Sequence, residues 1–432
     1  MLTASGAQFI DWSSAYRLFK GNRMNMSKIF GIIRKEVVLS NGLNHPYIYA
    51  HMDDTLLRKR GKKIFGTAWM RDPLGPPFAS NFVWGQRFIQ VSLSLLEHGI
   101  WGPSRAVPVD FTHCPPVKKP SKNANDQEIA TFSQKQKNEK MSAIGLQRII
   151  SLREDLNADG FSTKKVVLSV DGSYTNETIL KKLPVGIELI GRIRKDAKLF
   201  APAEVKPHQR GRKPYFGKEL PTPEQIRQCS DIPYKKIEAW AAGKKRIFEV
   251  KTLNNVRWRK SGERNLMLII IRPVSYRLTK HSKLLYRNPA YLISTSHLID
   301  LQLLVQAYIR RWEIEVGFRD QKTLIGCGHA QVREKSAAEK VPAFVSACYA
   351  MMLVAANKAN YKDLTQLPAT KWYNQTKKIR YTTSDLLNRL RMEKWLDTVK
   401  INLTHFVKME EKMAKLGKSN NPTLTAMFYN KN

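Results

Sequence analysis

The sequence predicts an α/β protein: a mixed sheet flanked by helices, interrupted by a β-rich insertion, with helical N- and C-terminal regions. Three observations carry this prediction. Short apolar runs rich in β-branched residues, of which Lys165–Val170 (KVVLSV) is the clearest, indicate strands buried on both faces. Segments with apolar residues at helical spacing come later, over Leu301–Lys322 and Ala337–Ala356. Between these groups, from about residue 195 to 288, Pro, Gly and Lys accumulate and strand-like runs recur.

The expected elements follow one another along the whole chain. Two short amphipathic helices are expected first, over Phe9–Phe19 and Met26–Val37. A long polar helix is expected later, from about Asp126 to Asn157. The expected strands are Tyr47–Met52, Phe82–Leu95, Ala106–Phe111, Lys165–Val170, Ile237–Ala241, Arg246–Leu253, Leu266–Pro273 and Tyr291–Ser294.

The charge of the chain indicates the class of its partner. Its 432 residues contain 73 Lys and Arg against 36 Asp and Glu, which leaves a net charge of +37 spread along the whole chain. A folded protein so basic repels itself unless a polyanion meets it, and nucleic acid is the leading polyanion. The hydrophobic content of 42% is that of a folded protein and excludes a disordered tail. Composition therefore predicts nucleic-acid binding but does not indicate whether the protein is an enzyme.

Cysteine usage and apolar runs indicate the compartment. The cysteines are far apart and form no C-x-x-C pair, which disfavours a zinc site or a disulfide framework and fits a reducing cytoplasm. The N-terminus lacks the layout of a signal peptide. The most apolar late stretch, Val341–Ala356, is shorter than a membrane span, so we expect a buried helix and no membrane partner.

Two predicted strands end at acidic residues. Asp171 follows KVVLSV, and Asp54 follows Tyr47–Met52. Phosphodiester cleavage by two metal ions needs carboxylates from separate segments that meet around ions ~4 Å apart. Either aspartate could instead cap a helix or form a turn. Asp53 competes with Asp54, because adjacent strand residues point to opposite faces and only one of them can face a shared site.

The predicted helix Leu301–Lys322 carries a polar face. At about 100° per residue, the side chains of Tyr308, Arg311, Glu315 and Lys322 fall within about 60° of one another. One acid, two bases and a phenol on one face suit a site that binds metal and phosphate together. Glu313 falls on a different side of the helix, so the geometry favours Glu315. The alternative is a solvated face with i,i+4 pairing of Arg311 and Glu315.

These residues resemble a known group of enzymes. The spacing is Tyr308-x2-Arg311-x3-Glu315-x6-Lys322. It is similar to the Y-R-E-K signature of bacterial insertion-sequence transposases with an Asp-Asp-Glu (DDE) site, the insertion-sequence-four superfamily. Asp54-Thr55 resembles the first acidic motif of that group, and Val170-Asp171-Gly172 resembles the second. The resemblance covers roughly Tyr47 to Ala356 and includes a β-rich insertion between the second Asp and the Glu.

The resemblance implies a fold and a reaction. The core would be ribonuclease-H-like, and Asp54, Asp171 and Glu315 would be catalytic and bind two Mg²⁺ ions, with Mn²⁺ able to substitute. The enzyme would nick the ends of an insertion sequence with water, form and open a hairpin, and join the 3′ ends to target DNA. Tyr308, Arg311 and Lys322 would contact phosphates. The partners would be double-stranded DNA at terminal inverted repeats, target DNA, and a second copy of the chain in a homodimer.

The resemblance to these transposases also predicts that the chain is divided into five regions. A small helical DNA-binding region is expected over 1–45, and a basic helical region over 361–432. The catalytic core would comprise 46–194 and 291–360, and the β-rich insertion 195–290.

Other basic segments are further DNA-binding candidates. Arg210, Arg212 and Lys213 resemble a minor-groove hook, with a solvated basic loop as the alternative. Trp258 lies among cations, as a DNA contact at a strand end would, but it could equally be a core residue. Tyr291 is the position nearest the tryptophan that holds a flipped base in the resembled group, and a core position is again the alternative.

Two other functions compete with a transposase. One is a ribonuclease-H-like DNA nuclease that cuts without joining. The other is a catalytically inactive relative that only binds DNA, which the intact acidic residues and the full Y-R-E-K spacing disfavour.

Overall fold

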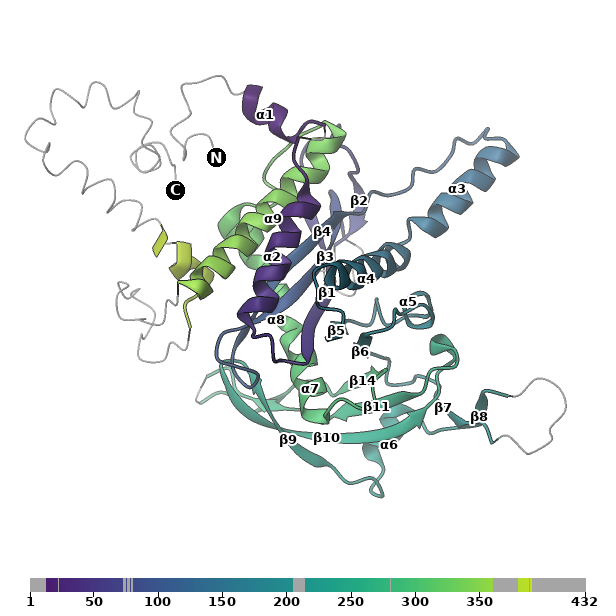
Figure 1. The fold of residues 1–432 in the computed structure, drawn as a ribbon. Helices are drawn as coiled ribbons and strands as arrows, with labels where there is room; N and C mark the ends of the chain where they lie inside the picture. The colour runs from purple at the N-terminus through teal and green to yellow at the C-terminus, as the bar shows by residue number, and fades with distance from the viewer. Residues whose placement is uncertain are drawn as a thin grey trace, which may run out of the picture.

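One large mixed sheet organises the protein (Figure 1). The computed structural model describes residues 13–21, 23–72, 75, 78, 81–204, 214–279, 281–359, 380–387 and 389–390. The strand order is β2-β3-β1-β5-β6-β14-β11-β10-β9, and β4 pairs with β3 outside this path. The strands are β1 Tyr47–Arg58, β2 Ala68–Arg71, β3 Phe82–Leu96, β4 Ser104–His113, β5 Lys165–Val170, β6 Ile187–Arg192, β9 Lys235–Ala241, β10 Lys244–Val256, β11 Leu266–Ile271 and β14 Ala290–Ser294.

The pairing directions confirm the predicted fold class. β1, β5 and β6 are mutually parallel, whereas the other pairs of this sheet are antiparallel. A mixed sheet with helices on its faces is the arrangement expected of a ribonuclease-H-like core.

β5 lies between two layers of the core. Val167 packs in one hydrophobic cluster with Tyr49, and Leu168 packs in another with Met52. Successive residues of a strand point to opposite faces, so both faces of β5 are covered. This explains why KVVLSV lacks the alternation of a half-exposed strand.

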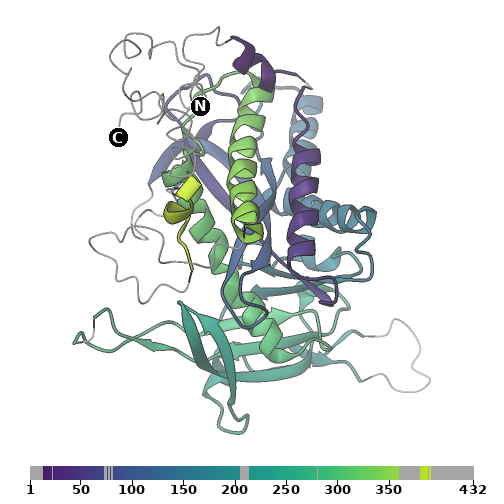
Figure 2. The same cartoon turned by 60° about the vertical axis from the view of Figure 1, so that its left-hand side comes forward.

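Helices cover the two faces of the sheet. The helices are α1 Ser13–Phe19, α2 Met26–Ser40, α3 Asp126–Asn138, α4 Met141–Ala158, α5 Glu177–Lys181, α6 Pro223–Gln228, α7 Leu301–Arg310, α8 Trp312–Asp320 and α9 Lys335–Lys358. Residues of α2, α4 and α9 share one cluster with Met52 and Leu168, and residues of α7 share the other with Tyr49 and Val167. α2 and α9 lie side by side in both views (Figures 1 and 2).

The apolar helix predicted near the C-terminal part of the core is α9. By length and composition α9 could cross a membrane, but 56% of its most apolar stretch is buried inside the protein. Ala343, Ala347 and Leu353 all belong to the main hydrophobic cluster. The expectation of a buried helix is therefore confirmed.

The first acidic motif does not end its strand, contrary to the prediction. β1 continues to Arg58, because its antiparallel partner β3 accompanies it along this whole stretch. The parallel partner β5 ends earlier, where Val170 pairs with Met52. Asp53 and Asp54 therefore lie where β1 has lost its neighbour on the β5 side.

Two predicted helices are each divided. The helix expected over Leu301–Lys322 becomes α7, α8 and a π-helical turn over Gln321–Ile325. The division falls at Arg311, whose backbone N–H donates to the Tyr308 carbonyl only three residues earlier. The polar helix expected from Asp126 becomes α3 and α4.

The β-rich segment shares the central sheet. β9, β10 and β11 continue the sheet beyond β14, and two small hairpins complete the segment: β7 (Phe200–Pro202) with β8 (Phe216–Glu219), and β12 (Ser275–Tyr276) with β13 (Leu285–Tyr286). The five-region division remains a prediction. Residues 1–12, 205–213, 360–379 and 391–432 lie outside the described residues, and most of the predicted C-terminal region falls among them.

Candidate active site

Asp171 lies directly after β5 and is held by its own turn. Its Oδ1 accepts hydrogen bonds from the backbone N–H groups of Ser173 (2.9 Å) and Tyr174 (3.3 Å), and its Oδ2 accepts one from the Ser173 hydroxyl (3.1 Å). The Thr175 hydroxyl donates to the Asp171 carbonyl at 2.7 Å. Asp171 therefore forms part of the turn that follows its strand. Such bonds also fix the carboxylate at the open end of a buried strand.

Asp53 is the neighbour of Asp171 across the sheet. Since Met52 pairs with Val170 in parallel register, the next residues of the two strands are Asp53 and Asp171. Burial and, to a smaller extent, the nearby Asp171 carboxylate raise the pKa of Asp53 to about 7, while Arg311 opposes the change. Two carboxylates are therefore brought together at the edge of the parallel strands.

Asp54 points to different partners. Its Oδ1 accepts a hydrogen bond from the Tyr174 hydroxyl at 3.0 Å, and its Oδ2 lies 3.6 Å from Nε of Arg87. Burial raises the pKa of Asp54, while Arg87 and the Tyr174 hydroxyl lower it. Asp171 and Lys322 also act on this pKa, so Asp54 remains within the electrostatic reach of the same site.

Arg311 joins the helix to the sheet. Its guanidinium donates to Oδ2 of Asp53 and to Oε1 of Glu315, each at 3.0 Å. The side chain is largely buried, and charge-assisted bonds of this kind are stronger than neutral ones. Acidic groups from β1 and α8 therefore meet through one cation, next to Asp171 at the end of β5.

The other two residues of the Y-R-E-K spacing surround this centre. Burial raises the pKa of Tyr308, whereas the nearby Arg311 and Arg192 lower it. Lys322 lies in the π-helical turn, where burial lowers its pKa and Asp54 is among the charges acting on it. Although the helix is interrupted at Arg311, Tyr308 and Lys322 both remain within electrostatic reach of the aspartates of the site.

Glu313 faces away, as its position on the helix predicts. Both of its carboxylate oxygens bind the guanidinium of Arg380, at 2.9 and 3.0 Å. Glu313 therefore contacts the C-terminal segment through Arg380. Glu315 is the glutamate of α8 that lies at the site.

The site has the donor chemistry of a divalent-metal centre. Among the residues that the structure describes, no three His, Cys, Asp or Glu side chains come close enough together to hold a metal ion. Carboxylate oxygens are nevertheless the ligands that Mg²⁺ prefers, and the Arg311 guanidinium holds a positive charge between two of them. The acidic residues therefore fit a metal chemically, with Arg311 in the position of a substitute cation.

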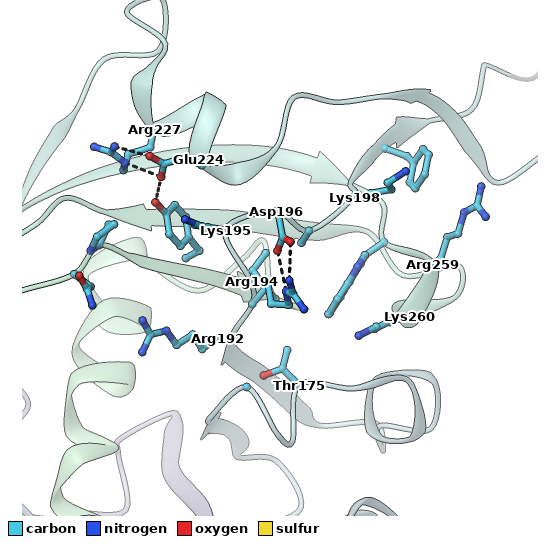
Figure 3. A pocket seen from close by; sticks show the side chains of 18 of the residues that line it. Thr175, Arg192, Arg194, Lys195, Asp196, Lys198, Glu224, Arg227, Arg259 and Lys260 are labelled. Carbon is cyan, nitrogen blue, oxygen red and sulfur yellow. Dashed lines mark hydrogen bonds and ion pairs between the residues drawn. The ribbon is translucent and has the colours of Figure 1, made fainter. Parts of the chain in front are cut away.

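A large basic pocket opens beside Asp171. Gly172 and Thr175, which follow Asp171, form part of its wall, and the cavity volume is about 1200 Å³ (Figure 3). This exceeds the ~300–1,000 Å³ of most small-molecule pockets. The cations lining it are Arg192, Arg194, Lys195, Lys198, Arg227, Arg259 and Lys260, and the acids are Asp196, Glu219 and Glu224.

Part of this charge is neutralised within the pocket. Arg194 pairs with Asp196 at 2.7 Å, and Arg227 pairs with Glu224 at 2.6 Å (Figure 3). The remaining cations of the pocket form no salt bridge with any residue that the structure describes. The wall beside Asp171 therefore presents unneutralised positive charge.

Two aromatic side chains singled out in the sequence support this pocket from within the core. Trp258 is only 8% exposed and belongs to the main hydrophobic cluster, and Lys260 lies 5.1 Å over its ring. Tyr291 is also buried in that cluster, and its hydroxyl donates to Glu224. These rings position charged groups of the pocket, while Arg210, Arg212 and Lys213 lie outside the described residues.

Sequence reasoning missed several members of the site. Arg192 and Arg87 carry no motif, and Tyr174 is one ordinary residue of a turn. In the sequence, Asp53 appears only as a competitor of Asp54. The one available signal was strand register, since Asp53 and Asp171 follow two runs that pair in parallel, but register depends on the partner strand and is absent from local sequence.

A comparison with protein families agrees with this geometry. A family model described as DDE superfamily endonuclease matches residues 16–263, more than half of the chain. The matched stretch contains Asp53, Asp54 and Asp171 and ends before Glu315. No curated protein matches the chain.

Proposed function

Because the chain belongs to the family of DDE superfamily endonucleases, we propose that it is a transposase that cuts and joins DNA at the ends of an insertion sequence. Its substrates are the terminal inverted repeats of the element and target DNA, and it acts as a homodimer on them. In this proposal the chain is a member of the insertion-sequence-four superfamily, the group with the Y-R-E-K signature.

The observation that carries the proposal is the bridge made by Arg311. One guanidinium contacts Asp53 of β1 and Glu315 of α8 at 3.0 Å each, beside the Asp171 carboxylate of β5. Acidic groups from three distant chain segments therefore lie in one region, although no three of the described carboxylates are close enough to hold an ion together. Convergence of this kind is what phosphodiester cleavage with divalent metals requires.

The proposed roles differ between the two aspartates of β1. Asp54, Asp171 and Glu315 would hold two Mg²⁺ ions, with Mn²⁺ as a substitute. Bound ions would supply the positive charge that stabilises charge developing on the phosphate oxygens. Asp53 would act as a positioning residue, since its ion pair holds Arg311 toward the site.

The cations around the site fit a polyanionic substrate. Tyr308, Arg311 and Lys322 would contact phosphates beside the scissile bond through a phenol donor and two charge-assisted donors. The basic pocket next to Asp171 extends this surface with Arg192, Lys195 and further cations. DNA fits this combination better than a small acidic ligand does, because a polymer can follow both surfaces.

The first prediction separates chemistry from binding. Asp54→Asn, Asp171→Asn and Glu315→Gln should each abolish DNA cleavage, since each removes a metal ligand, while DNA affinity changes little because many Lys and Arg supply it. The measurement is cleavage of labelled DNA from the ends of the element, run together with a gel shift. Glu313→Gln is the matched control on the same helix and should cut nearly normally.

The same assay decides the competing readings. Parallel loss of cleavage and binding would show that the acidic residues serve folding. If Asp53→Asn abolishes cleavage and Asp54→Asn cuts normally, Asp53 is the metal ligand and Asp54 is not. An enzyme that cuts but never yields joined product would be a nuclease, and one that binds without cutting would be an inactive relative.

A further inference from the structure

An aromatic surface lies on the hairpin at the edge of the sheet. β2 is an edge strand that pairs with β3, so that Trp69 lies opposite Trp84 and Arg71 opposite Phe82. Opposed residues share a face, and so do alternate residues of one strand. These four side chains therefore lie on one face of the hairpin, and we call them the hairpin surface.

The hairpin surface is exposed and firmly supported. Trp69 is 65% exposed and Phe82 is 54% exposed. The Trp69 ring meets Trp84 edge-to-face, with ring centroids 5.7 Å apart. The Trp84 indole N–H donates to the Gly61 carbonyl at 3.2 Å, which holds this ring in place behind Trp69. Large exposed aromatic groups on an edge strand indicate an interaction site.

The charge around the hairpin surface indicates its partner. Between residues 55 and 96 the only acid is Asp72, and the exposed cations are Arg58, Arg60, Lys62, Lys63 and Arg71. That carboxylate is already paired with Arg58 at 2.8 Å. Exposed rings among cations suit a ligand with flat π faces and negative charges, and a nucleic-acid strand has both. The same charge would repel an identical copy of this segment.

The hairpin surface lies on the same strand, β3, that pairs with Asp53 at the candidate active site, and the β3 residues between them on this face are buried. Gln90 lies opposite Asp53 and accepts a hydrogen bond from Gln321 at 3.0 Å. Trp84 is six residues from Gln90 along β3, so both side chains lie on the same face of the strand. At ~3.4 Å per residue, the two residues are about 20 Å apart. This distance corresponds to roughly six nucleotides at ~3.4 Å each.

We propose that the hairpin surface binds unpaired bases of a DNA strand leaving the active site, with Trp69 stacking on a base and Arg71 contacting its phosphate. This inference rests on the proposed function, which supplies the DNA. Bases expose their faces only where strands are separated, as they are near a cut end, so a single strand is the form that an exposed indole recognises.

The test measures the affinity of the full-length chain for a fluorescein-labelled 30-nucleotide single strand by fluorescence anisotropy, in EDTA so that no cleavage occurs. Trp69→Ala should weaken binding roughly five- to a hundredfold, the range for loss of one stacked base. Trp69→Phe should retain most of the affinity. Trp101→Ala is the matched control, since Trp101 is 38% exposed and lies beyond the opposite end of β3.

Several results would overturn the inference. They are unchanged affinity in Trp69→Ala, an equal loss in Trp101→Ala, or a larger loss on the corresponding duplex than on the single strand. A lower sedimentation mass of Trp69→Ala without DNA would assign the surface to self-association instead. Failure of the proposed function is distinguishable, because the wild-type chain would then bind the strand in a Trp69-dependent way but cleave no DNA.

Discussion

Neighbouring residues of identical chemistry have different tasks in this protein, and their contacts distinguish them. Arg311 bridges Asp53 and Glu315, whereas Arg310 lies 5.1 Å over the Tyr49 ring and donates to the Ile100 carbonyl. Burial lowers the pKa of Arg310 to about 10. One arginine therefore belongs to the site and the other supports the core beneath it.

A histidine in this core leads to a prediction about acid stability. His51 is fully buried on β1, and its Nε2 lies 2.7 Å from the Ser94 hydroxyl. Burial lowers its pKa from 6.5 to about 3, and Arg310 and Arg311 contribute in the same direction. The unfolded chain thus binds the proton more readily, so the stabilisation is present above pH 6.5 and is lost as the pH falls toward 3.

Urea unfolding between pH 4 and pH 6 measures this effect. The free energy of unfolding of the wild-type chain should fall more steeply with acid than that of His51→Gln, by up to ~1.4 kcal/mol per pH unit for one proton. His297→Gln is the control, since His297 is exposed, and its slope should match the wild type. Identical slopes for His51→Gln and wild type would refute the assignment.

At the scale of elements, the interrupted helix is the main functional feature. α7 packs on the sheet through its apolar face, while α8 and the π-helical turn carry Glu315 and Lys322. π-Helical turns are rare and occur frequently at functional sites. The irregular turns at Arg311 and Gln321 lie on either side of Glu315, so the element that bears the acidic residue is held at both ends by polar contacts.

Lys322 provides the prediction at this scale. Lys322→Ala should impair hairpin formation or strand joining more than the first nick, because the later steps require the DNA end to be held against the site. Loss of one charge-assisted contact costs ~1.5–3 kcal/mol, or roughly ten- to over a hundredfold in rate. Single-turnover kinetics on a labelled element end would score nick, hairpin and joined product separately.

Arg319→Ala is the matched control for this experiment. Arg319 precedes Lys322 by one turn, is exposed and pairs with Asp320. An equal loss at every step would make Lys322 a general binding residue. No loss at all would show that this part of the helical face is merely solvated.

At the scale of the whole molecule, charge is both abundant and organised. The net charge of +37 includes the basic pocket beside Asp171 and the cations around the hairpin surface, at opposite sides of the parallel strands. Charge distributed in this way favours contact with DNA over an extended path and steers association over long range.

DNA affinity should therefore depend steeply on salt. If the chain neutralises on the order of ten phosphates, the log–log slope of affinity against salt should be near −9, since each contact contributes ~0.9. Titration of labelled duplex across salt concentrations measures it. A slope shallower than about −3 would mean that most of the charge faces away from DNA.

Local sequence was sufficient for the central strand β5 and for the relative positions of the two glutamates on the helix. KVVLSV predicted a doubly buried strand because apolar β-branched residues without alternation suit no other short element, and the position of Glu315 relative to Glu313 follows from helical periodicity alone. The charge on the chain likewise predicted nucleic acid from composition. These properties depend on residues that are close together in the sequence, so they do not depend on how distant segments are arranged.

Tertiary structure decided which of these groups meet. The register of β5 beside β1 places Asp53 next to Asp171, and the longer pairing of β1 with β3 carries the strand past Asp54 to Arg58. The break at Arg311 and the pocket wall formed by Arg192 and Lys260 depend on contacts across the fold. The register of β1 with β5 and the ion pair of Arg311 with Asp53 join segments more than a hundred residues apart, so no local pattern encodes them.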